Sequence, residues 1–185
     1  MTIPLLLIRH GPTDWTEAGR LQGRVDQPLS ELGRELLRRR ELPPEFLAWD
    51  WISSPLQRAV ETGLILRGML ARLEHALIER DAGTFEGLTR AELEAKSSAL
   101  RLREGLDWCP PGGESPRQVM ARLSPWLLRL ARPTVAITHR GVIEAALALA
   151  TGWDYTGPPP AKIKPAVALR FAVTAGKLRF EGPLE

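Results

Sequence analysis

Cysteine, histidine and long apolar runs are all scarce in this chain of 185 residues. Its single cysteine, Cys109, excludes an intrachain disulfide and provides no cysteine cluster for a metal ion. The longest apolar stretch near the N-terminus, Ile3 to Ile8, is too short for a signal-peptide core or a membrane-spanning helix. We therefore expect a cytoplasmic protein that has no membrane partner.

A strong charge of one sign is also missing, because the formal net charge is only +3. This small excess raises the question of a nucleic-acid partner, yet the basic residues are dispersed and mostly alternate with acids. The densest basic run, Arg38 to Arg40, ends a predicted helix, where cations complement the helix dipole. We expect no nucleic-acid partner.

The remaining composition is typical of a globular protein, with 44% hydrophobic and 25% charged residues. A chain of this length can bury a core as one domain, which we predict to span residues 1–185. Short apolar runs alternate with segments of helical period, and this pattern favours an α/β fold. We predict a three-layer sandwich in which helices flank a mainly parallel central sheet, with a hairpin-like strand pair at the end.

The strands are predicted from short apolar runs bounded by polar or turn residues. The predicted strands are Ile3 to Ile8, Trp49 to Ser53, His75 to Glu79, Thr134 to Thr138, Val167 to Val173 and Lys177 to Glu181. The last two are predicted to form a hairpin around Ala175-Gly176.

Two helices are predicted between the first strands. "SELGRELLRRR" places Leu29, Leu32 and Leu36 on one face, which we expect to be buried. "SSPLQRAVETGLIL" offers Ser54 as N-cap and Pro55 as the first helical residue, where a missing N–H costs little.

Two further helices follow in the second half of the chain. Ser115 and Gln118 in "ESPRQVMARL" predict a capping box at the start of a helix. Its expected buried stripe consists of Val119, Leu123, Leu127 and Leu130. An almost wholly apolar helix after Gly141 is expected to be buried against the sheet and to stop at Gly152.

The span from about 96 to 113 is long for a simple connection and contains Arg101, Arg103, Trp108 and Cys109. Long loops in α/β enzymes often cover a site, so one interpretation is a lid that sets specificity. The other interpretation is a surface excursion that contains one short helix.

Polar residues follow four of the predicted strands at their carboxyl ends. Arg9 and His10 follow the first, Arg58 lies in the helix after the second, Glu79 ends the third and His139 follows the fourth. Ligands of open α/β sheets gather at this edge, so we expect these side chains to converge on one anion.

Each residue type has a chemical reason to be at such a site. Guanidinium groups bind phosphate oxygens through paired hydrogen bonds. A neutral imidazole is a nucleophile toward phosphorus, and neighbouring cations help to keep His10 neutral. A glutamate near the leaving oxygen can donate a proton and later accept one from water. None of these steps requires a metal ion.

The sequence resembles the histidine phosphatase superfamily, in the branch of cofactor-dependent phosphoglycerate mutases and small phosphatases such as α-ribazole phosphatase. The similarity rests on five motifs in the family's order: "LIRHGPTDWTEAGRLQGRVDQPLSELG", "ISSPLQRAVETG", "IERDAGTFEG", "PPGGES" and "ITHRGVI". The resemblance implies that His10 is the phosphorylated nucleophile and Glu79 the proton donor. It also implies that Arg9, Arg58 and His139 bind the phosphoryl group.

The resemblance further implies a substrate-facing rim, and we expect no cofactor. Thr13 matches a position that touches the phosphate, whereas Gln22 and Gly23 match a substrate-facing segment. Thr16, also expected to contact substrate, stands where the family often has asparagine. Pro12 and Arg140 are two more departures, the second at a position where the family frequently has glycine. These differences affect the predicted substrate more than the predicted catalysis.

Three functions are compatible with these residues. The first is a metal-independent phosphomonoesterase that acts on a small phosphorylated metabolite through a phosphohistidine. The second is a cofactor-dependent phosphoglycerate mutase, but mutases of this family are typically longer and carry additional arginines. The third is a non-catalytic protein that binds a phosphorylated ligand. A homodimer is common in this family and stays an open expectation.

Overall fold

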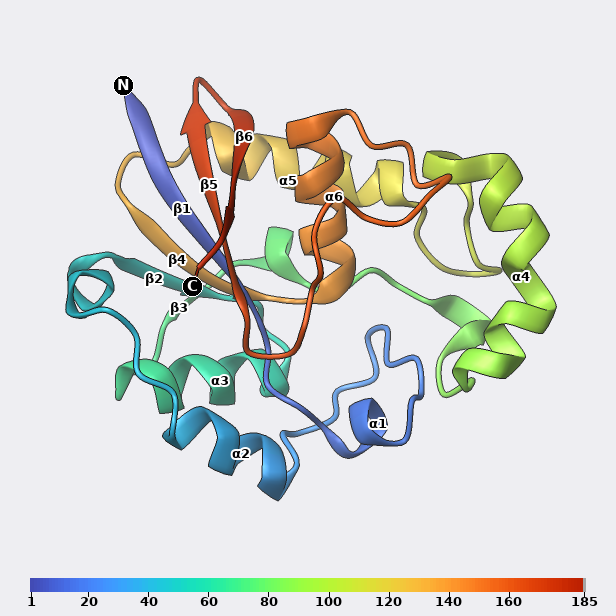
Figure 1. Cartoon of the computed structure of the whole chain (residues 1–185), viewed down its shortest axis with the longest axis horizontal. Helices are drawn as coiled ribbons and strands as arrows, with labels where there is room; N and C mark the ends of the chain where they lie inside the picture. Colours follow the sequence, from blue (N-terminus) through green and yellow to red (C-terminus); the bar gives the residue numbers. More distant parts are fainter. Residues whose placement is uncertain (185) are drawn as a thin grey trace.

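The computed structural model describes residues 1–184, and for residues 98–102 it describes the backbone alone. A six-stranded sheet with the order β3-β2-β4-β1-β5-β6 forms its centre (Figure 1). The strands are β1 (Thr2–Arg9), β2 (Asp50–Ser53), β3 (Arg72–Leu73), β4 (Thr134–Thr138), β5 (Ala168–Thr174) and β6 (Lys177–Pro183). Strands β1 to β4 are parallel to one another. Strand β5 pairs antiparallel with β1, and β6 pairs antiparallel with β5.

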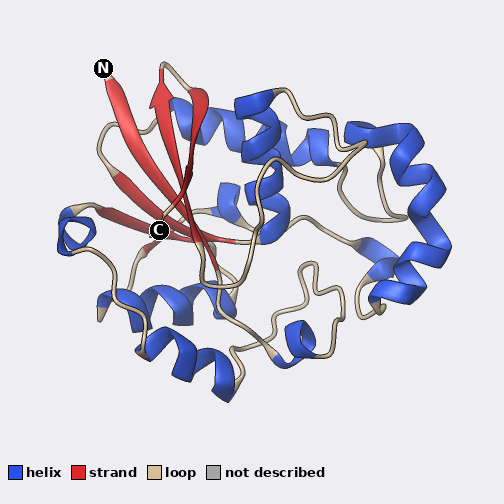
Figure 2. Ribbon diagram, viewed as in Figure 1, coloured by secondary structure: helices blue, strands red, loops and turns tan. Residues whose placement is uncertain are grey.

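Helices cover both faces of this sheet, so the predicted three-layer α/β architecture is confirmed (Figure 2). The helices are α1 (Asp14–Glu17), α2 (Glu31–Arg38), α3 (Gln57–Arg67), α4 (Arg90–Glu104), α5 (Pro116–Leu128) and α6 (Arg140–Thr151). Short 3-10 helices are formed by Pro44–Ala48, His75–Leu77, Gly83–Phe85 and Gly105–Asp107. In Figure 1, α2 and α3 lie on one side of the sheet and α5 and α6 on the other.

Strand β1 illustrates why its sequence is apolar without alternation. Leu5 and Leu7 pack into the core beneath α5 and α6, whereas Leu6 and Ile8 pack into the core on the α3 side. Because successive strand side chains point to opposite faces, a strand covered by helices on both faces needs apolar residues at every position.

The predicted strand from His75 to Glu79 is wrong. The edge strand β3 is Arg72–Leu73, and it pairs with Ile52 and Ser53 of β2. The amide of Glu74 still donates to the carbonyl of Ser53 at 2.9 Å, and the chain then turns into a 3-10 helix. Because β2 ends at Ser53, no ladder partner is left for the following residues. Glu79 therefore follows an irregular segment.

Two predicted helix features are also wrong. Helix α3 begins at Gln57 with Leu56 as its N-cap, so Ser54 does not cap it. In α2, Leu32 and Leu36 are exposed and the buried residues are Gly33 and Leu37. A Cβ at Gly33 would collide with the carbonyl of Pro12, so close packing at this glycine decides which face of α2 turns inward.

The other helix predictions are confirmed. Ser115 and Gln118 form the capping box of α5. Val119, Leu123 and Leu127 are buried, and Leu130 lies half-buried just beyond the helix end. Helix α6 is largely buried and ends at Gly152, whose φ of 76° is the left-handed conformation that favours glycine. The closing hairpin turns at Ala175 and Gly176, both with positive φ.

The expected lid, residues 96 to 113, contains more helix than predicted. It begins inside α4, passes through the 3-10 helix Gly105–Asp107 and ends in an irregular segment with a turn at residues 111–112. Arg103 is exposed and pairs with Glu104 of its own helix, and the side chain of Arg101 lies outside the described residues. Among the side chains of this span that the structure describes, those of Trp108 and Pro110 line the cleft described below.

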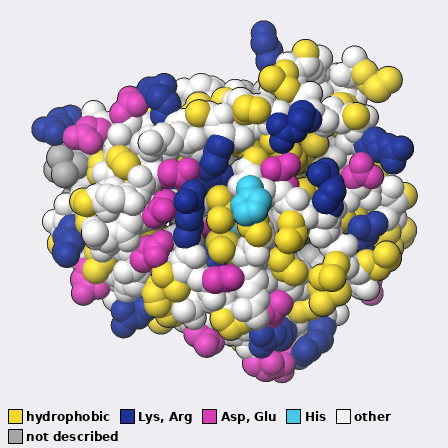
Figure 3. Space-filling view, turned by 180° about the vertical axis from the view of Figure 1, so that it is seen from behind, with side chains coloured by type: hydrophobic (Ala, Val, Ile, Leu, Met, Phe, Trp, Pro, Cys, Tyr) yellow, Lys and Arg dark blue, Asp and Glu magenta, His cyan; other side chains and the backbone are white. Residues whose placement is uncertain are grey.

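Basic and acidic side chains are interspersed with apolar ones on the face of the molecule shown in Figure 3. Several of the ion pairs lie on exposed helix faces, such as Arg39 with Glu35 and Arg90 with Glu94. Such pairs belong to an ordinary solvated surface.

Candidate active site

The carboxyl edge of the parallel strands brings two histidines together. Arg9 of β1 is aligned with Thr138 of β4, so the residues that follow, His10 and His139, are neighbours. Their ring centroids lie 5.1 Å apart. The parallel pairing of β1 with β4 thus joins residues that are far apart in the sequence.

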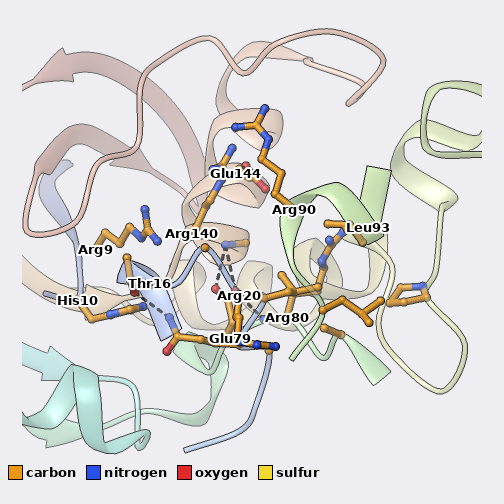
Figure 4. Close-up of a pocket in the computed structure, with 18 of the residues that line it drawn as sticks. Arg9, His10, Thr16, Arg20, Glu79, Arg80, Arg90, Leu93, Arg140 and Glu144 are labelled. Atoms are coloured by element: carbon orange, nitrogen blue, oxygen red, sulfur yellow. Dashed lines mark hydrogen bonds and ion pairs between the residues drawn. The ribbon is translucent and has the colours of Figure 1, made fainter. Parts of the chain in front are cut away.

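A cleft of about 520 Å³ opens beside His10 (Figure 4). Six of the predicted site residues line it: Arg9, His10, Thr16, Gln22, Gly23 and Glu79. The other three, Thr13, Arg58 and His139, are fully buried at 0% exposure and are not among the residues that line the cleft. The cleft is large enough for a phosphate ester together with a sizeable leaving group.

The hydrogen bond of His10 fixes its tautomer. Nδ1 lies 2.7 Å from the carbonyl oxygen of Gly11, and since a carbonyl only accepts, Nδ1 carries the proton. Burial lowers the pKa of His10 well below its usual value, and the charges of Arg58 and Arg9 lower it further. The ring is therefore neutral at physiological pH, and its lone pair is on Nε2, the nitrogen able to attack an electrophile.

His139 and Arg58 form a buried pair beside His10. Arg58 Nε donates to Nδ1 of His139 at 3.3 Å, so Nε2 carries the proton and donates to Ser54 Oγ at 2.7 Å. Burial, followed by the electrostatic influence of the neighbouring His10 and Arg58, lowers the pKa of His139 well below its usual value. The remaining Arg58 nitrogens donate to the carbonyls of Gly23 and Val25 at 2.7 and 2.8 Å.

Glu79 lines the same cleft and is held by two backbone amides. Its Oε1 accepts from the amide of Arg80 at 2.7 Å and from the amide of Gly141 at 3.0 Å. Gly141 lies in the first turn of α6, whose positive end faces the carboxyl group. Burial nevertheless raises the pKa of Glu79 above its usual value, although the Arg80 hydrogen bond and the charge of Arg58 oppose the shift. This carboxyl group is suited to hold a proton and to donate it.

A known protein-family model matches nearly the whole chain. The sequence model of the histidine phosphatase superfamily, branch 1, matches residues 5–182. The chain belongs to this superfamily.

Known relatives of this histidine phosphatase include enzymes of two activities. A glucosyl-3-phosphoglycerate phosphatase of Mycobacterium tuberculosis is 36% identical over 166 residues, covering 76% of this chain and 72% of that protein. A 2,3-bisphosphoglycerate-dependent phosphoglycerate mutase of Azorhizobium caulinodans is 32% identical over 153 residues, covering 76% of this chain and 74% of that protein. Among solved structures, TTHB049 from Thermus thermophilus superposes with a TM-score of 0.79 at 33% identity, covering 98% of this chain and 99% of that chain.

Arg9 of this histidine phosphatase has spare hydrogen-bonding capacity. One of its nitrogens donates to the carbonyl of Ile163 at 3.1 Å, whereas the buried Nε has no hydrogen-bond partner. Burial and the charge of Arg140 lower the pKa of Arg9 to about 10, so the group is still charged at pH 7. A buried, charged and incompletely bonded guanidinium favours binding of an anion.

A chain of hydroxyl and amide groups forms another part of the site. Thr13 caps α1 by accepting from the amide of Thr16 at 3.1 Å, and the two hydroxyls also lie 3.1 Å apart. The Gln22 amide nitrogen donates to Thr16 Oγ1 at 2.9 Å, which leaves the buried Oε1 of Gln22 without a partner. Thr16 and Gln22 reach the cleft, whereas Thr13 holds Thr16 from behind.

The arginines farther along the cleft received no site role from sequence reasoning. These are Arg20, Arg80, Arg90 and Arg140, which line the cleft and are labelled in Figure 4. Arg80 and Arg140 directly follow Glu79 and His139, so adjacency to two motif residues is a usable signal. Arg20 gives no such signal, because the loop after α1 brings it to the cleft.

Two kinds of feature are absent from the described residues. Within that part of the chain, no group of three or more His, Cys, Asp or Glu side chains is placed to hold a metal ion. No helix there combines the length and the apolar character that crossing a membrane requires.

Proposed function

We propose that this protein is a metal-independent phosphomonoesterase that works through a phosphohistidine at His10. The observation that carries the proposal is the pairing of a neutral His10, with its lone pair on Nε2, and a Glu79 whose pKa is raised, in one cleft. A histidine phosphatase needs a nucleophile and a proton donor at the same time, and these two groups supply both.

The reaction runs in two displacements at phosphorus. His10 Nε2 attacks the phosphoryl group, the ester P–O bond breaks, and Glu79 gives its proton to the leaving alkoxide. Water then attacks the phosphohistidine, Glu79 takes one of its protons, and the P–N bond breaks to release inorganic phosphate. Arg9, which lines the cleft, binds the phosphoryl oxygens, and buried Arg58 stabilises their negative charge through its own charge from outside the cleft.

The outer part of the cleft favours a substrate with a second anionic group. Two of its arginines are paired with carboxylates, Arg90 with Glu94 and Arg140 with Glu144. Arg20 and Arg80 also line the cleft, so this group of side chains has two more arginines than carboxylates. The M. tuberculosis relative is a phosphatase whose substrate name contains a phosphoglycerate. We propose a small phosphate ester whose alcohol part bears a carboxylate or a further phosphate.

A phosphoglycerate mutase is the weaker alternative, supported by the A. caulinodans relative. A mutase would return the phosphoryl group from His10 to the bound product, whereas a phosphatase passes it to water. A non-catalytic function is disfavoured because the neutral nucleophile and the proton donor are both in place. We further propose a single domain in the cytoplasm that needs no cofactor, no nucleic acid and no membrane, with a homodimer left open.

The test is the release of p-nitrophenol from its phosphate ester in excess EDTA by the wild type and by His10→Ala. We expect turnover that survives EDTA and is lost in the variant, with 32P from a labelled ester trapped as acid-labile phosphohistidine. Transfer of the label to a phosphoglycerate in preference to water would favour the mutase. Equal turnover in both proteins would overturn the role of His10.

A further inference from the structure

The segment that carries Glu79 lies outside the sheet, so its main chain has no ladder to hold it. Strand β3 ends at Leu73, and three later carbonyl groups, those of Ala76, Ile78 and Glu79, accept from one guanidinium instead. Arg122 of α5 donates to them at 2.6, 2.7 and 3.3 Å, respectively. One arginine thus takes the place of a neighbouring strand.

Arg122 is itself fixed by Glu114. Arg122 Nε lies 3.1 Å from one Glu114 oxygen, and a terminal nitrogen lies 3.2 Å from the other, the paired geometry of a guanidinium and a carboxylate. Both side chains are largely buried, at 20% and 17% exposure, so solvent screens this pair less than a surface pair. Burial opposes ionisation of Glu114, yet hydrogen bonding to Arg122 and its charge hold the pKa of Glu114 below its usual value.

A second arginine contacts the same segment and shares the Glu114 carboxylate. Arg24 Nε donates to the Glu79 carbonyl at 3.3 Å, and its terminal nitrogens pair with Asp81 at 3.4 Å and with Glu114 at 3.1 Å. Glu114 also accepts from the amide of Asp81 at 3.2 Å. The main chain on both sides of the Glu79 carboxyl group is therefore anchored to one carboxylate.

None of these anchoring groups is among the residues that line the cleft. We infer that Arg122, held by Glu114, is a positioning residue that aims the Glu79 carboxyl group at the leaving oxygen of the substrate. This inference rests on the proposed function, because it assigns Arg122 an effect on proton donation by Glu79. Without Arg122 the three carbonyls lose their shared donor, and the carboxyl group loses its fixed direction.

The expected signature is a dependence on the leaving group. p-Nitrophenolate leaves readily without full protonation, whereas the alkoxide of an alkyl phosphate such as glycerol 2-phosphate needs the proton. The constant kcat/KM covers the steps up to alcohol release, so it isolates donation by Glu79 from the later attack of water. Because general acid catalysis contributes about 10²–10⁴-fold, misplacing the acid should cost the alkyl ester a large part of this factor.

The experiment compares kcat/KM for both esters in wild type, Arg122→Met and Arg122→Lys. We expect Arg122→Met to lower kcat/KM for glycerol 2-phosphate about 30-fold more than for p-nitrophenyl phosphate, and Arg122→Lys to recover part of this difference. Arg117→Met is the matched control, because Arg117 lies on the same helix, is exposed and pairs with Asp107. It should leave both values unchanged.

A folded Arg122→Met protein with equal losses on both esters, or with none, would overturn the positioning role. If that variant does not fold, Glu114→Gln is tested instead, because it keeps the shape of the Glu114 side chain and removes the negative charge that holds Arg122. The positioning role then requires Glu114→Gln to lower kcat/KM for glycerol 2-phosphate more than for p-nitrophenyl phosphate. Absence of turnover and of phosphohistidine in the wild type would instead reject the proposed function, so the two failures are distinguishable.

Discussion

The amide of Gly141 donates to Glu79 Oε1 at 3.0 Å, and a Cβ placed on Gly141 would lie 2.5 Å from that same oxygen. The contact joins the first turn of α6 to the irregular segment after β3. Glycine at this position therefore permits both the hydrogen bond and the close approach of the carboxyl group to the helix end.

Gly141→Ala should displace the Glu79 carboxyl group without unfolding the protein, because alanine favours the helix that Gly141 occupies. We expect kcat/KM for an alkyl phosphate to fall about 10–100-fold, less than the about 10²–10⁴-fold expected for Glu79→Gln. Gly157→Ala is the control, since a Cβ there meets nothing within 4 Å. Unchanged kinetics of Gly141→Ala would show that the contact does not position the acid.

The pH dependence of kcat/KM should show the two shifted groups. His10 must be neutral to attack, and its lowered pKa places the acid limb below pH 6.5, the ordinary histidine value. Glu79 must be protonated to donate, and its raised pKa places the alkaline limb above pH 4.5. We expect a bell-shaped profile in which activity is lost as pH falls through the pKa of His10 and as pH rises through the pKa of Glu79.

Arg58→Met tests the electrostatic part of this profile. The charge of Arg58 lowers the pKa of both His10 and Glu79, so its removal should move both limbs toward higher pH. The maximal rate should fall about 10²–10³-fold, as expected when one preorganised positive group is removed. The substrate's own titration is identical for both proteins, and a profile that only drops in height would contradict the assignment.

Trp108→Ala should change substrate preference more than it changes turnover of p-nitrophenyl phosphate. Trp108 lines the cleft and is 5% exposed, and the guanidinium of Arg80 lies 5.3 Å from the centre of its ring. Loss of the indole removes an apolar wall and frees Arg80 to move. Trp108→Phe retains an aromatic face and should be milder, whereas equal losses on every ester would contradict a role in specificity.

Arg140→Ala should impair substrates that carry a second anionic group. Arg140 lines the cleft and donates to Glu144 at 2.7 Å. We expect kcat/KM for 3-phosphoglycerate to fall about tenfold, which matches the loss of one charged hydrogen bond, and that for p-nitrophenyl phosphate to change little. Arg103→Ala, which removes an exposed arginine outside the cleft, serves as the control. A uniform loss would remove Arg140 from substrate recognition.

The core strands and the place of His10 at the end of β1 could be predicted from the sequence because both depend on local signals. Strands β1 and β4 are buried on both faces, so their sequences are almost continuously apolar and are recognisable as buried strands. The polar residues that directly follow them mark the sheet edge. Capping residues were equally informative at α5, where Ser115 bonds the amide of Gln118.

The errors arose where tertiary contacts override local pattern. His75 to Glu79 has the composition of a strand, but β2 offers it no further partner and Arg122 binds its carbonyls instead. Ser54 has the residue type of an N-cap, but its hydroxyl bonds His139. In α2, the packing at Gly33 turns Leu37 inward and leaves Leu32 exposed.

The sequence by itself determined the α/β class and the positions of His10, His139, Arg58 and Glu79 along the chain, because strand periodicity and motif order are local properties. Only the tertiary structure decided which of these groups face the cleft, which tautomer each histidine adopts and how Glu79 is held. The physical reason is that pKa values, hydrogen-bond partners and cleft walls depend on atoms brought together from distant segments. The parallel pairing of β1 with β4 and the Arg122 contacts behind Glu79 supply those atoms.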